Sequence, residues 1–261
     1  MSSMKVRQFM NIAHRGASSY APENTFAAYN KALAMGITHI ELDVHFTSDD
    51  HIVVIHDDTV DRTTDGSGPV SGKTLAEIQK LDAGSWFGPD HAPAYAGAPI
   101  HTLAEVLQAY KGRLHFHIEI KARDARTGLA RRTIDMVRGH GLTEGATITS
   151  FHKHWLQEAA DYDSVLPKGW LVPLGPGSQW EDSIIDESKD LGITQICPRA
   201  DITTPEVVSK IRAAGFVVRC QGLTNEELMR HVVDIGADGA TVNFPDKMTE
   251  YLKAKGIEQA P

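Results

Sequence analysis

Residues 35–44 read MGITHIELDV, a stretch in which a glycine follows a helical segment and a β-branched apolar strand begins almost at once. Glycine just beyond a helix end readily takes the left-handed conformation that stops the helix. A short link to a strand then completes the helix-to-strand half of a parallel βαβ unit. This stretch therefore predicts one step of an alternating α/β fold.

The same step recurs along the chain, as HGLTEGATITSF, LGITQICP, AGFVVRCQ and IGADGATVNFP. The pattern predicts eight strands, at Phe9–Ala13, Ile37–Val44, Leu114–Ile120, Ala146–Ser150, Lys168–Val172, Ile193–Cys197, Phe216–Cys220 and Gly239–Val242. Helices are expected between most of them, for example at Thr25–Met35, Ala125–Arg138, Pro205–Ala214 and Asn225–Ile235. Eight alternating units favour a (β/α)8 TIM barrel, with a doubly wound open sheet as the alternative.

The alternation breaks between Phe46 and Ile100. We expect a short extra strand at Ile52–Ile55 and a short helix near Leu75–Leu81, separated by a run rich in glycine and proline. Long loops on a compact domain are often functional, although this one is also open to the interpretation of a mere decoration. The prediction is one TIM-barrel domain over residues 1–261, with a segment of about residues 57–100 inserted after the second strand and covering the active-site mouth.

The overall composition narrows the classes of partner and compartment. The 261 residues carry a formal net charge of −8, which argues against nucleic acid or an anionic membrane surface as a partner. Cys197 and Cys220 do not form a metal-type spacing and are expected to be reduced core thiols. Because apolar runs are too short for a membrane span or a signal peptide, we expect a cytoplasmic protein without a stable membrane anchor. No sequence feature points to an oligomeric state.

Two acidic side chains share one face of the predicted strand Ile37–Val44. Side chains alternate across a strand, so Ile40, Leu42 and Val44 point to the face that packs against outer helices. Glu41 and Asp43 point to the other face, which is the inside of a barrel. Inward carboxylates repel each other unless a positive charge lies between them, and a hard divalent cation would supply it.

The stretch LHFHIEIKA, residues 114–122, adds to this acidic group. If the strand Leu114–Ile120 is the neighbour of the strand Ile37–Val44, Glu119 joins Glu41 and Asp43 at one mouth of the barrel. Three carboxylates form an oxygen-rich site suited to one divalent cation, Mg²⁺ or Ca²⁺. Lys121 offers a positive charge to an anion at the same place. The alternative is a buried ion-pair network, with Lys121 and Arg15 neutralising the acids.

Two histidines are expected at that mouth, because His14 ends the first strand and His56 ends the short extra strand. Imidazole suits proton transfer near neutral pH, and the guanidinium of Arg15 can bind two phosphate oxygens at once. Placed on either side of a phosphorus atom, one histidine could deprotonate the attacking oxygen while the other protonates the leaving oxygen. A metal ion would neutralise the charge on the phosphoryl oxygens.

An ordered series of motifs gives the chain a resemblance to a known family. HRG is followed by PENT, ELDV, HDDTVDRTTDGSG, AGSWF, IEIK, SF and ADGATVNFPD. In this order they resemble the glycerophosphodiester phosphodiesterase family over nearly the whole chain. The resemblance implies a (β/α)8 barrel with a small insertion after the second strand. It also implies divalent-metal hydrolysis of a small-molecule glycerophosphodiester to glycerol 3-phosphate and an alcohol.

The resemblance assigns roles residue by residue. It implies catalytic histidines at His14 and His56, metal carboxylates at Glu41, Asp43 and Glu119, and phosphate-binding residues at Arg15 and Lys121. Glu23, in the PENT motif, is expected to orient the His-Arg-Gly loop. The family suggests the glycerol 2-hydroxyl as first nucleophile, giving a cyclic phosphate that water opens; direct attack by water is the alternative. We favour His56 as the acid for the leaving alcohol.

The chain departs from the family pattern at two places near the expected mouth. Residues 220–225 read CQGLTN where relatives usually have a Trp-Thr-Val-Asn run, and Asn243 stands where aspartate is frequent. These differences bear on the choice of substrate rather than on the type of reaction. Two other function classes are the alternatives: a metal-dependent barrel lyase or isomerase that stabilises an enolate, and a non-catalytic barrel that binds phosphate.

Overall fold

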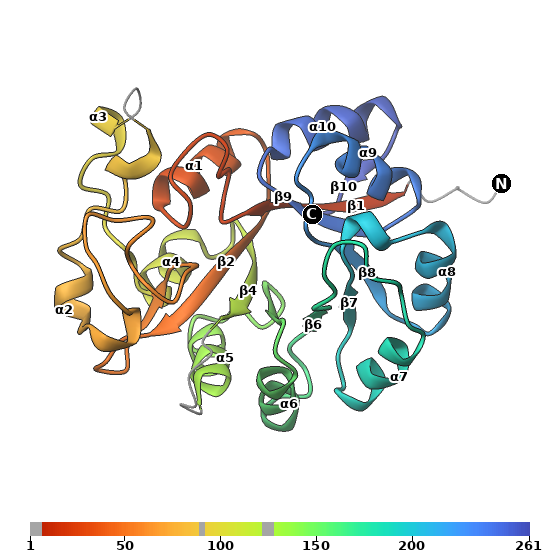
Figure 1. Ribbon diagram of the computed structural model, residues 1–261, viewed down its shortest axis with the longest axis horizontal. Coiled ribbons are helices and arrows are strands. Elements are labelled where there is room, and N and C mark those ends of the chain that lie inside the picture. The colour runs from red at the N-terminus through yellow and green to blue at the C-terminus, as the bar shows by residue number, and fades with distance from the viewer. Residues whose placement is uncertain (1–6, 89–91, 122–127) are drawn as a thin grey trace.

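Parallel strands close into a barrel in the computed structural model, which describes residues 7–88, 92–121 and 128–261 (Figure 1). The barrel strands are β1 (Gln8–His14), β2 (His39–Phe46), β4 (His115–Ile120), β5 (Ala146–Ser150), β6 (Lys168–Leu171), β7 (Gln195–Cys197), β8 (Val217–Cys220) and β9 (Gly239–Val242). Strand β1 pairs in parallel with both β2 and β9, which closes the ring. The predicted (β/α)8 TIM barrel is confirmed, and the open-sheet alternative is wrong.

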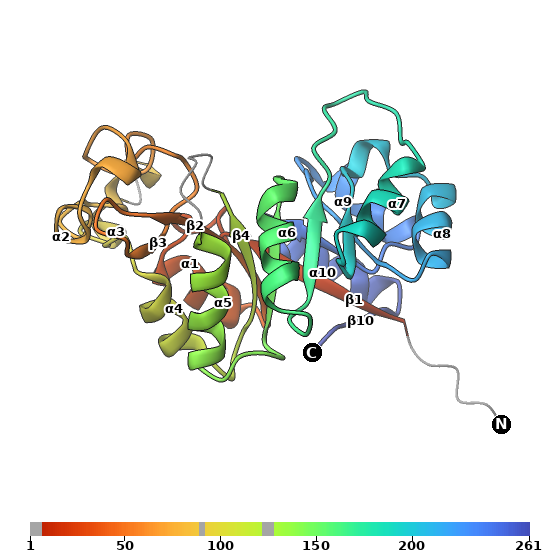
Figure 2. The ribbon, with the colours of Figure 1, turned by 90° about the horizontal axis from the view of Figure 1, so that it is seen from below.

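Helices surround the strands in both views of the ribbon (Figures 1 and 2). They are α1 (Phe26–Ala34), α4 (Leu103–Tyr110), α5 (Leu129–Gly139), α6 (Lys153–Tyr162), α7 (Ser183–Asp190), α8 (Pro205–Ala213), α9 (Glu226–Asp234) and α10 (Pro245–Ala254). A short strand β10 (Glu258–Gln259) pairs with β1 beyond the last helix. The helix expected from residue 125 is observed as α5, and the part of that expectation before residue 128 lies outside the described residues.

The end of helix α1 shows why residues 35–44 pass from helix to strand as they do. Gly36 has a φ of 76°, and the N–H of Ile37 donates to the carbonyl of Ala32 at 3.0 Å. The N–H of Ile37 therefore caps the helix, and strand pairing starts only at His39, two residues later than predicted.

The two faces of the barrel strands differ in chemistry. Ile40, Leu42 and Ile118 are fully buried in the apolar layer between strands and helices. Burial of a side chain of this size contributes roughly 1.5–3 kcal/mol. The inner faces instead carry polar residues, so that Glu41 and His117 are register partners inside the barrel. The interior is therefore the part of the fold where chemistry can be placed.

The predicted interruption after the second strand is present as a small lobe beside the barrel. Strand β3 (Ile52–Val54) pairs antiparallel with β2, and two short helices follow, α2 (Leu75–Ile78) and α3 (Ala92–Tyr95), which Figure 1 places at one end of the molecule. Its buried apolar residues form a cluster of their own, made of Val53, Ile55, Val60, Val70, Ile78, Ala83 and Ile100. Trp86, Phe87 and Tyr95 stack edge to face within this segment.

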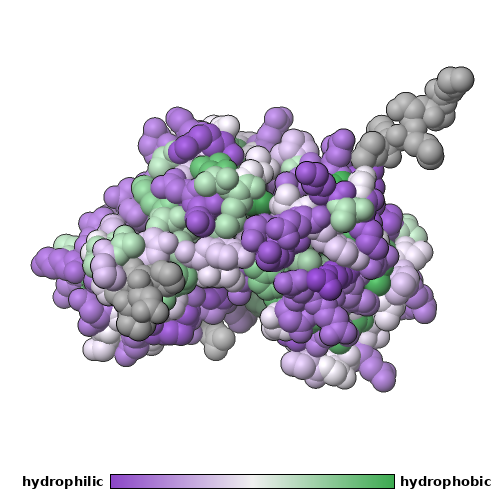
Figure 3. Space-filling model, turned by 90° about the horizontal axis from the view of Figure 1, so that it is seen from above, coloured by the Kyte–Doolittle hydropathy of each residue, from purple (hydrophilic) through white to green (hydrophobic). Residues whose placement is uncertain are grey.

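The outer surface is mostly polar. In Figure 3 hydrophilic side chains dominate the face shown, and the apolar ones gather in small separate patches. Within the described residues, we find no helix whose length and apolar character would let it cross a membrane.

Candidate active site

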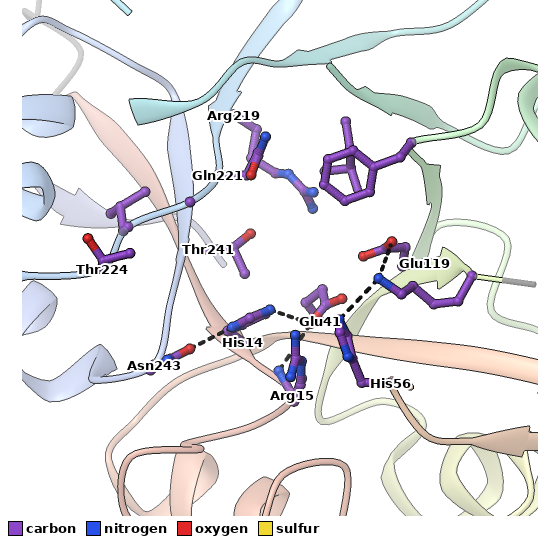
Figure 4. A pocket seen from close by; sticks show the side chains of 15 residues that line it. His14, Arg15, Glu41, His56, Glu119, Arg219, Gln221, Thr224, Thr241 and Asn243 are labelled. Atoms are coloured by element: carbon purple, nitrogen blue, oxygen red, sulfur yellow. Dashed lines mark hydrogen bonds and ion pairs between the residues drawn. The ribbon is translucent and has the colours of Figure 1, made fainter. Parts of the chain in front are cut away.

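A cavity of about 390 Å³ opens where the barrel strands end (Figure 4). In TIM barrels this C-terminal face is where functional side chains collect. His14 ends strand β1, Gln221 follows β8 and Asn243 follows β9, and all three line the cavity. Of the residues predicted from the sequence, six line it, namely His14, Arg15, Glu41, His56, Glu119 and Lys121. Asp43 is fully buried between them.

The His-Arg-Gly turn has a backbone that only certain residues tolerate. Arg15 has a φ of 58° and Gly16 a φ of 81°, both in the left-handed region. A Cβ on Gly16 would lie 2.7 Å from Ala28, so no larger residue fits there without a shift of helix α1. The turn directs the N–H of Arg15 to Oε2 of Glu41 at 3.1 Å. Its shape therefore joins the loop to the acidic group.

The guanidinium of Arg15 bridges an acidic residue of the loop before α1 and one of strand β2. Its Nη1 donates to Oε1 of Glu23 at 2.9 Å, and its Nε lies 3.4 Å from Oδ2 of Asp43. Burial lowers the pKa of Arg15, but the charges of Asp43 and Glu23 outweigh burial and raise it. The contact with Glu23 fits the role expected for that residue in orienting the loop.

The three carboxylates converge as expected from the strand pattern. Glu41, Asp43 and Glu119 each offer an oxygen, and these oxygens lie within 4.8 Å of one another. Asp43 and Glu119 are register partners on adjacent strands β2 and β4, which explains the meeting. Oε1 of Glu41 and Oδ1 of Asp43 are buried without a hydrogen-bond partner. Buried carboxylate oxygens that lack a donor are the arrangement that a hard divalent cation would satisfy.

Burial and the mutual repulsion of the three carboxyl groups shift their pKa values. Burial, then the charges of Asp43 and Glu119, raise the pKa of Glu41 well above its usual range. Burial and the charge of Asp43 raise the pKa of Glu119 to about 7. The pKa of Asp43 stays low, because Arg15 and His56 outweigh the effect of burial. Only one acid of the three is therefore readily ionised when no cation is bound.

The ion pairs considered as the alternative also exist. Nζ of Lys121 lies 3.1 Å from Oε1 of Glu119, and Arg15 contacts Asp43 as described above. These pairs leave the inner oxygens of Glu41 and Asp43 unpartnered. The residues therefore fit a cation and the ion pairs together, since the two use different oxygens.

The imidazole of His14 is held by a neutral partner. Its Nδ1 donates to Oδ1 of Asn243 at 2.6 Å, which leaves the lone pair on Nε2, 3.8 Å from Oε2 of Glu41. Burial and then the charge of Arg15 lower the pKa of His14 to about 4. His14 is therefore neutral at pH 7 and can accept a proton.

The imidazole of His56 is held by a charged partner. Its Nδ1 donates to Oδ1 of Asp57 at 2.5 Å, and its Nε2 accepts from Nζ of Lys121 at 3.1 Å. Burial and the charges of Arg15 and Lys121 lower the pKa of His56, and Asp43 and Asp57 offset this only in part. Asp57 is fixed in turn by Nε of Arg62 at 2.7 Å, and Arg62 also donates to Glu23. His56 thus has an anion beside it that would stabilise its protonated form.

Sequence reasoning missed Asp57, Arg62 and Arg219 as members of the site. The signal for the first two was in the stretch HDDTVDR, where an acid directly follows the histidine and an arginine comes five residues later. For Arg219 the signal was a charged residue inside the apolar strand FVVRC. Three aromatic residues of the inserted segment do not line the cavity and pack against one another instead, namely Trp86, Phe87 and Tyr95.

A second group of ring nitrogens lies deeper in the barrel. His39, His115 and His117 have nitrogens within 4.8 Å of one another, and Nδ1 of His39 lies 3.1 Å from Nε2 of His117. Burial lowers the pKa of each of the three, and the positive charge of Arg219 lowers it further. The positive charge of Arg219 would repel a cation bound to these three histidines. We therefore interpret them as a neutral polar layer below the cavity, called here the histidine floor.

Known proteins resemble this chain over most of its length. The sequence model of the glycerophosphoryl diester phosphodiesterase family matches residues 14–247. The chain is 34% identical to a glycerophosphodiester phosphodiesterase of Bacillus subtilis (strain 168) over 256 residues, covering 94% of this chain and 87% of the relative. It is also 34% identical to a glycerophosphodiester phosphodiesterase of Caldanaerobacter subterraneus, covering 94% of this chain and 98% of the relative.

Solved structures resemble the whole barrel. An Oleispira antarctica phosphodiesterase in complex with the product sn-glycerol-3-phosphate has a TM-score of 0.80 and 28% identity, covering 95% of this chain and 97% of the other. A glycerophosphodiester phosphodiesterase from Agrobacterium tumefaciens has a TM-score of 0.77 and 28% identity, covering 94% of this chain and 99% of the other.

Proposed function

The chain belongs to the glycerophosphoryl diester phosphodiesterase family, and from this premise we propose that it hydrolyses glycerophosphodiesters by two-histidine acid–base catalysis at a carboxylate-bound divalent cation. The products are glycerol 3-phosphate and an alcohol. It is an enzyme of the phosphoric diester hydrolase class, as its relatives of known name are. The small inserted segment of about residues 57–100 is part of this single barrel domain and supplies Asp57 and Arg62 to the mouth.

The phosphate group is bound by Arg15 and Lys121. Both cations line the cavity, Arg15 on the loop after β1 and Lys121 directly after β4. A guanidinium and an ammonium together can hold the non-bridging oxygens of a phosphodiester. Glu23 and Glu119 anchor these cations, and we expect the bound phosphorus to lie between the two histidines.

Glu41, Asp43 and Glu119 would hold the divalent cation, Mg²⁺ or Ca²⁺. Its chemistry when bound is to neutralise charge on the phosphoryl oxygens. The fit rests on the unpartnered buried oxygens of Glu41 and Asp43. The two metals remain equivalent choices, because carboxylate oxygens suit both.

The histidines divide the proton transfers between them. Nε2 of His14 carries a lone pair and takes the proton of the attacking oxygen, that of water or of the glycerol 2-hydroxyl. His56 donates a proton to the leaving alcohol, since the anion of Asp57 stabilises its protonated form. The proposal rests on the different hydrogen-bond partners of the two histidines, an amide for His14 and a carboxylate for His56.

Turnover of glycerophosphocholine tests the function, with Mg²⁺ or Ca²⁺ and with or without EDTA. We expect His14→Ala and His56→Ala each to lose at least about 100-fold in kcat, the usual contribution of general acid–base catalysis. His51→Ala, at an exposed histidine outside the cavity, is the matched control and should keep full activity. Circular dichroism checks that each variant is folded.

Other outcomes would decide for other classes. Full activity in either site variant would remove that histidine from the mechanism. Turnover that is indifferent to EDTA, or a metal titration unchanged in Glu41→Gln, would contradict the cation site. A folded wild-type protein that binds glycerol 3-phosphate but turns over no diester would be the non-catalytic phosphate-binding barrel instead.

A further inference from the structure

Arg219 is a buried cation that forms no ion pair among the described residues. Its side chain is 1% exposed, yet it lines the active-site cavity from strand β8, and Figure 4 shows the guanidinium pointing into it. Nε and Nη1 are buried without a hydrogen-bond partner. A buried charge of this kind is costly unless it is paired, so these two donors call for an acceptor.

The neighbours of Arg219 do not supply a negative charge. Within the described chain, the ion pairs at this mouth use Arg15, Arg62 and Lys121, not Arg219. Its side chain contacts the buried thiol of Cys197. Below it lies the histidine floor of the barrel, and imidazoles are neutral or positive. The acids of the metal site are the nearest source, and a bound cation would take up their charge.

A second donor lies beside this guanidinium. Oγ1 of Thr241, on strand β9, is buried without a partner, and its side chain is only 8% exposed. In Figure 4 Thr241 and Gln221 point into the same part of the cavity as Arg219. Gln221 also belongs to the run CQGLTN, residues 220–225, where the chain departs from the family pattern. The donors therefore form a small polar group that the proposed mechanism does not use.

The charges at the mouth balance without Arg219. The five acids at the mouth, Glu23, Glu41, Asp43, Asp57 and Glu119, are matched in number by a divalent cation together with Arg15, Arg62 and Lys121. In the proposed mechanism the reacting phosphate is held by Arg15 and Lys121, so a neutral or cationic alcohol would leave the donors of Arg219 without an acceptor. A further negative charge on the alcohol would pair Arg219.

We propose that Arg219 and Thr241 form an anion-binding subsite, and that the preferred substrates are glycerophosphodiesters whose second substituent carries an additional phosphate or carboxylate group. The guanidinium binds the anion through its free Nε–H and Nη1–H, and the threonine hydroxyl donates a third hydrogen bond. This inference rests on the proposed hydrolysis, because the subsite selects among its substrates.

The test compares kcat/KM across glycerophosphodiesters that differ in the charge of the alcohol. The panel is glycerophosphocholine, glycerophosphoglycerol, the terminally phosphorylated form of glycerophosphoglycerol, and glycerophosphoglycerate. We expect the wild type to favour the phosphate- and carboxylate-bearing members over glycerophosphoglycerol by about tenfold or more, as charge-assisted hydrogen bonds allow. Arg219→Gln should erase that preference, so that kcat/KM for the phosphate- and carboxylate-bearing members falls to that for glycerophosphoglycerol. Arg230→Gln, which removes an exposed arginine of helix α9, is the control and should keep the preference.

A binding measurement keeps the proposal separate from the hydrolysis. Calorimetry with Mg²⁺ compares a short alkyl bisphosphonate with its monophosphonate counterpart, neither of which is hydrolysed. The wild type should bind the bisphosphonate at least about tenfold more tightly, and Arg219→Gln should bind the two equally. If the wild type hydrolyses no diester but shows this difference, the proposed function fails and the subsite stands.

The opposite results would overturn the subsite. They are a wild type without preference for the anionic members, an Arg219→Gln variant that retains the preference, or a variant that loses activity equally on all substrates. If Arg219→Gln does not fold, Thr241→Val and Arg219→Lys replace it. Thr241→Val should then reduce the preference and Arg219→Lys should keep part of it, and no change in either variant would refute the proposal.

Discussion

His14 and His56 lie at the same mouth of the barrel, but their hydrogen-bond partners differ in charge. The amide oxygen of Asn243 orients His14 without adding charge, whereas the carboxylate of Asp57 adds a negative charge to His56. An anion next to an imidazole favours its protonated form. In the proposed mechanism, the roles of base and acid therefore depend on Asn243 and Asp57, neither of which is assigned to the phosphate.

Asp57 should act as a positioning residue for His56, and Asp57→Asn tests this. Loss of the anion lowers the pKa of His56, so the acid form disappears at lower pH. We expect kcat to fall about tenfold or more, and the alkaline limb of the kcat–pH profile to move to lower pH. Asp58→Asn, at the exposed next residue, should leave both unchanged. A uniform loss of activity with an unmoved pH profile would mean that Asp57 is only structural.

At the level of elements, the pairing of β2 with β4 explains both ends of the barrel interior. The register sets Asp43 beside Glu119 at the mouth and His39 beside His115 at the floor. His115 is stacked on His39 with ring centroids 4.8 Å apart, and its Nε2 contacts Oγ1 of Thr147 at 3.0 Å. Burial lowers the pKa of His115 to about 4, with His39 and Arg219 adding to the effect.

This floor should make the fold sensitive to acid. A histidine whose folded pKa lies below its unfolded value of 6.5 contributes stability above that pH, and the contribution is lost as pH falls from 6.5 toward 4. For His115 the loss amounts to at most about 3 kcal/mol. We expect His115→Gln to flatten the dependence of unfolding free energy on pH, measured by urea titration. Thr147→Val, which keeps the imidazole, should lower stability at every pH with the slope retained; an unchanged slope in His115→Gln would contradict this account.

The elements that the sequence predicted well are those fixed by local signals. Alternation along HIELDV gave the inward placement of Glu41 and Asp43, and glycine caps gave the order of helices and strands. Contacts between distant segments were not accessible in this way. Arg62 reaches Glu23 across 39 residues and His14 reaches Asn243 across 229, so these partners depend on closure of the barrel. Strand starts also shifted, because an N–H such as that of Ile37 serves the helix before it.

For the molecule as a whole, metal removal should cost stability in a pH-dependent way. Burial and neighbouring acids raise the pKa of Glu41 and of Glu119, the latter to about 7. Without a cation, the contribution of these two carboxyls to stability is greatest below their unfolded pKa of 4.5 and falls as pH rises through the folded value, since ionisation adds repulsion. A bound dication reverses that repulsion, so it should raise Tm more at about pH 8 than at about pH 5.

Thermal melts with EDTA, Mg²⁺ and Ca²⁺ measure this difference. At a metal concentration of about 100 Kd the stabilisation should be near 2.7 kcal/mol. Glu41→Gln should abolish most of the gain at the higher pH, and Glu206→Gln, at an exposed acid of helix α8, should not. Equal stabilisation at both pH values would argue against binding through the buried carboxylates.

The join between β1 and β9 has a consequence for how the protein is made. His14 is synthesised 229 residues before Asn243, yet the two share one hydrogen bond in the candidate active site. A nascent chain therefore carries the proposed base long before it can orient it. Activity would appear only after translation has passed Asn243, and its recovery during refolding would report the moment at which β1 and β9 have paired.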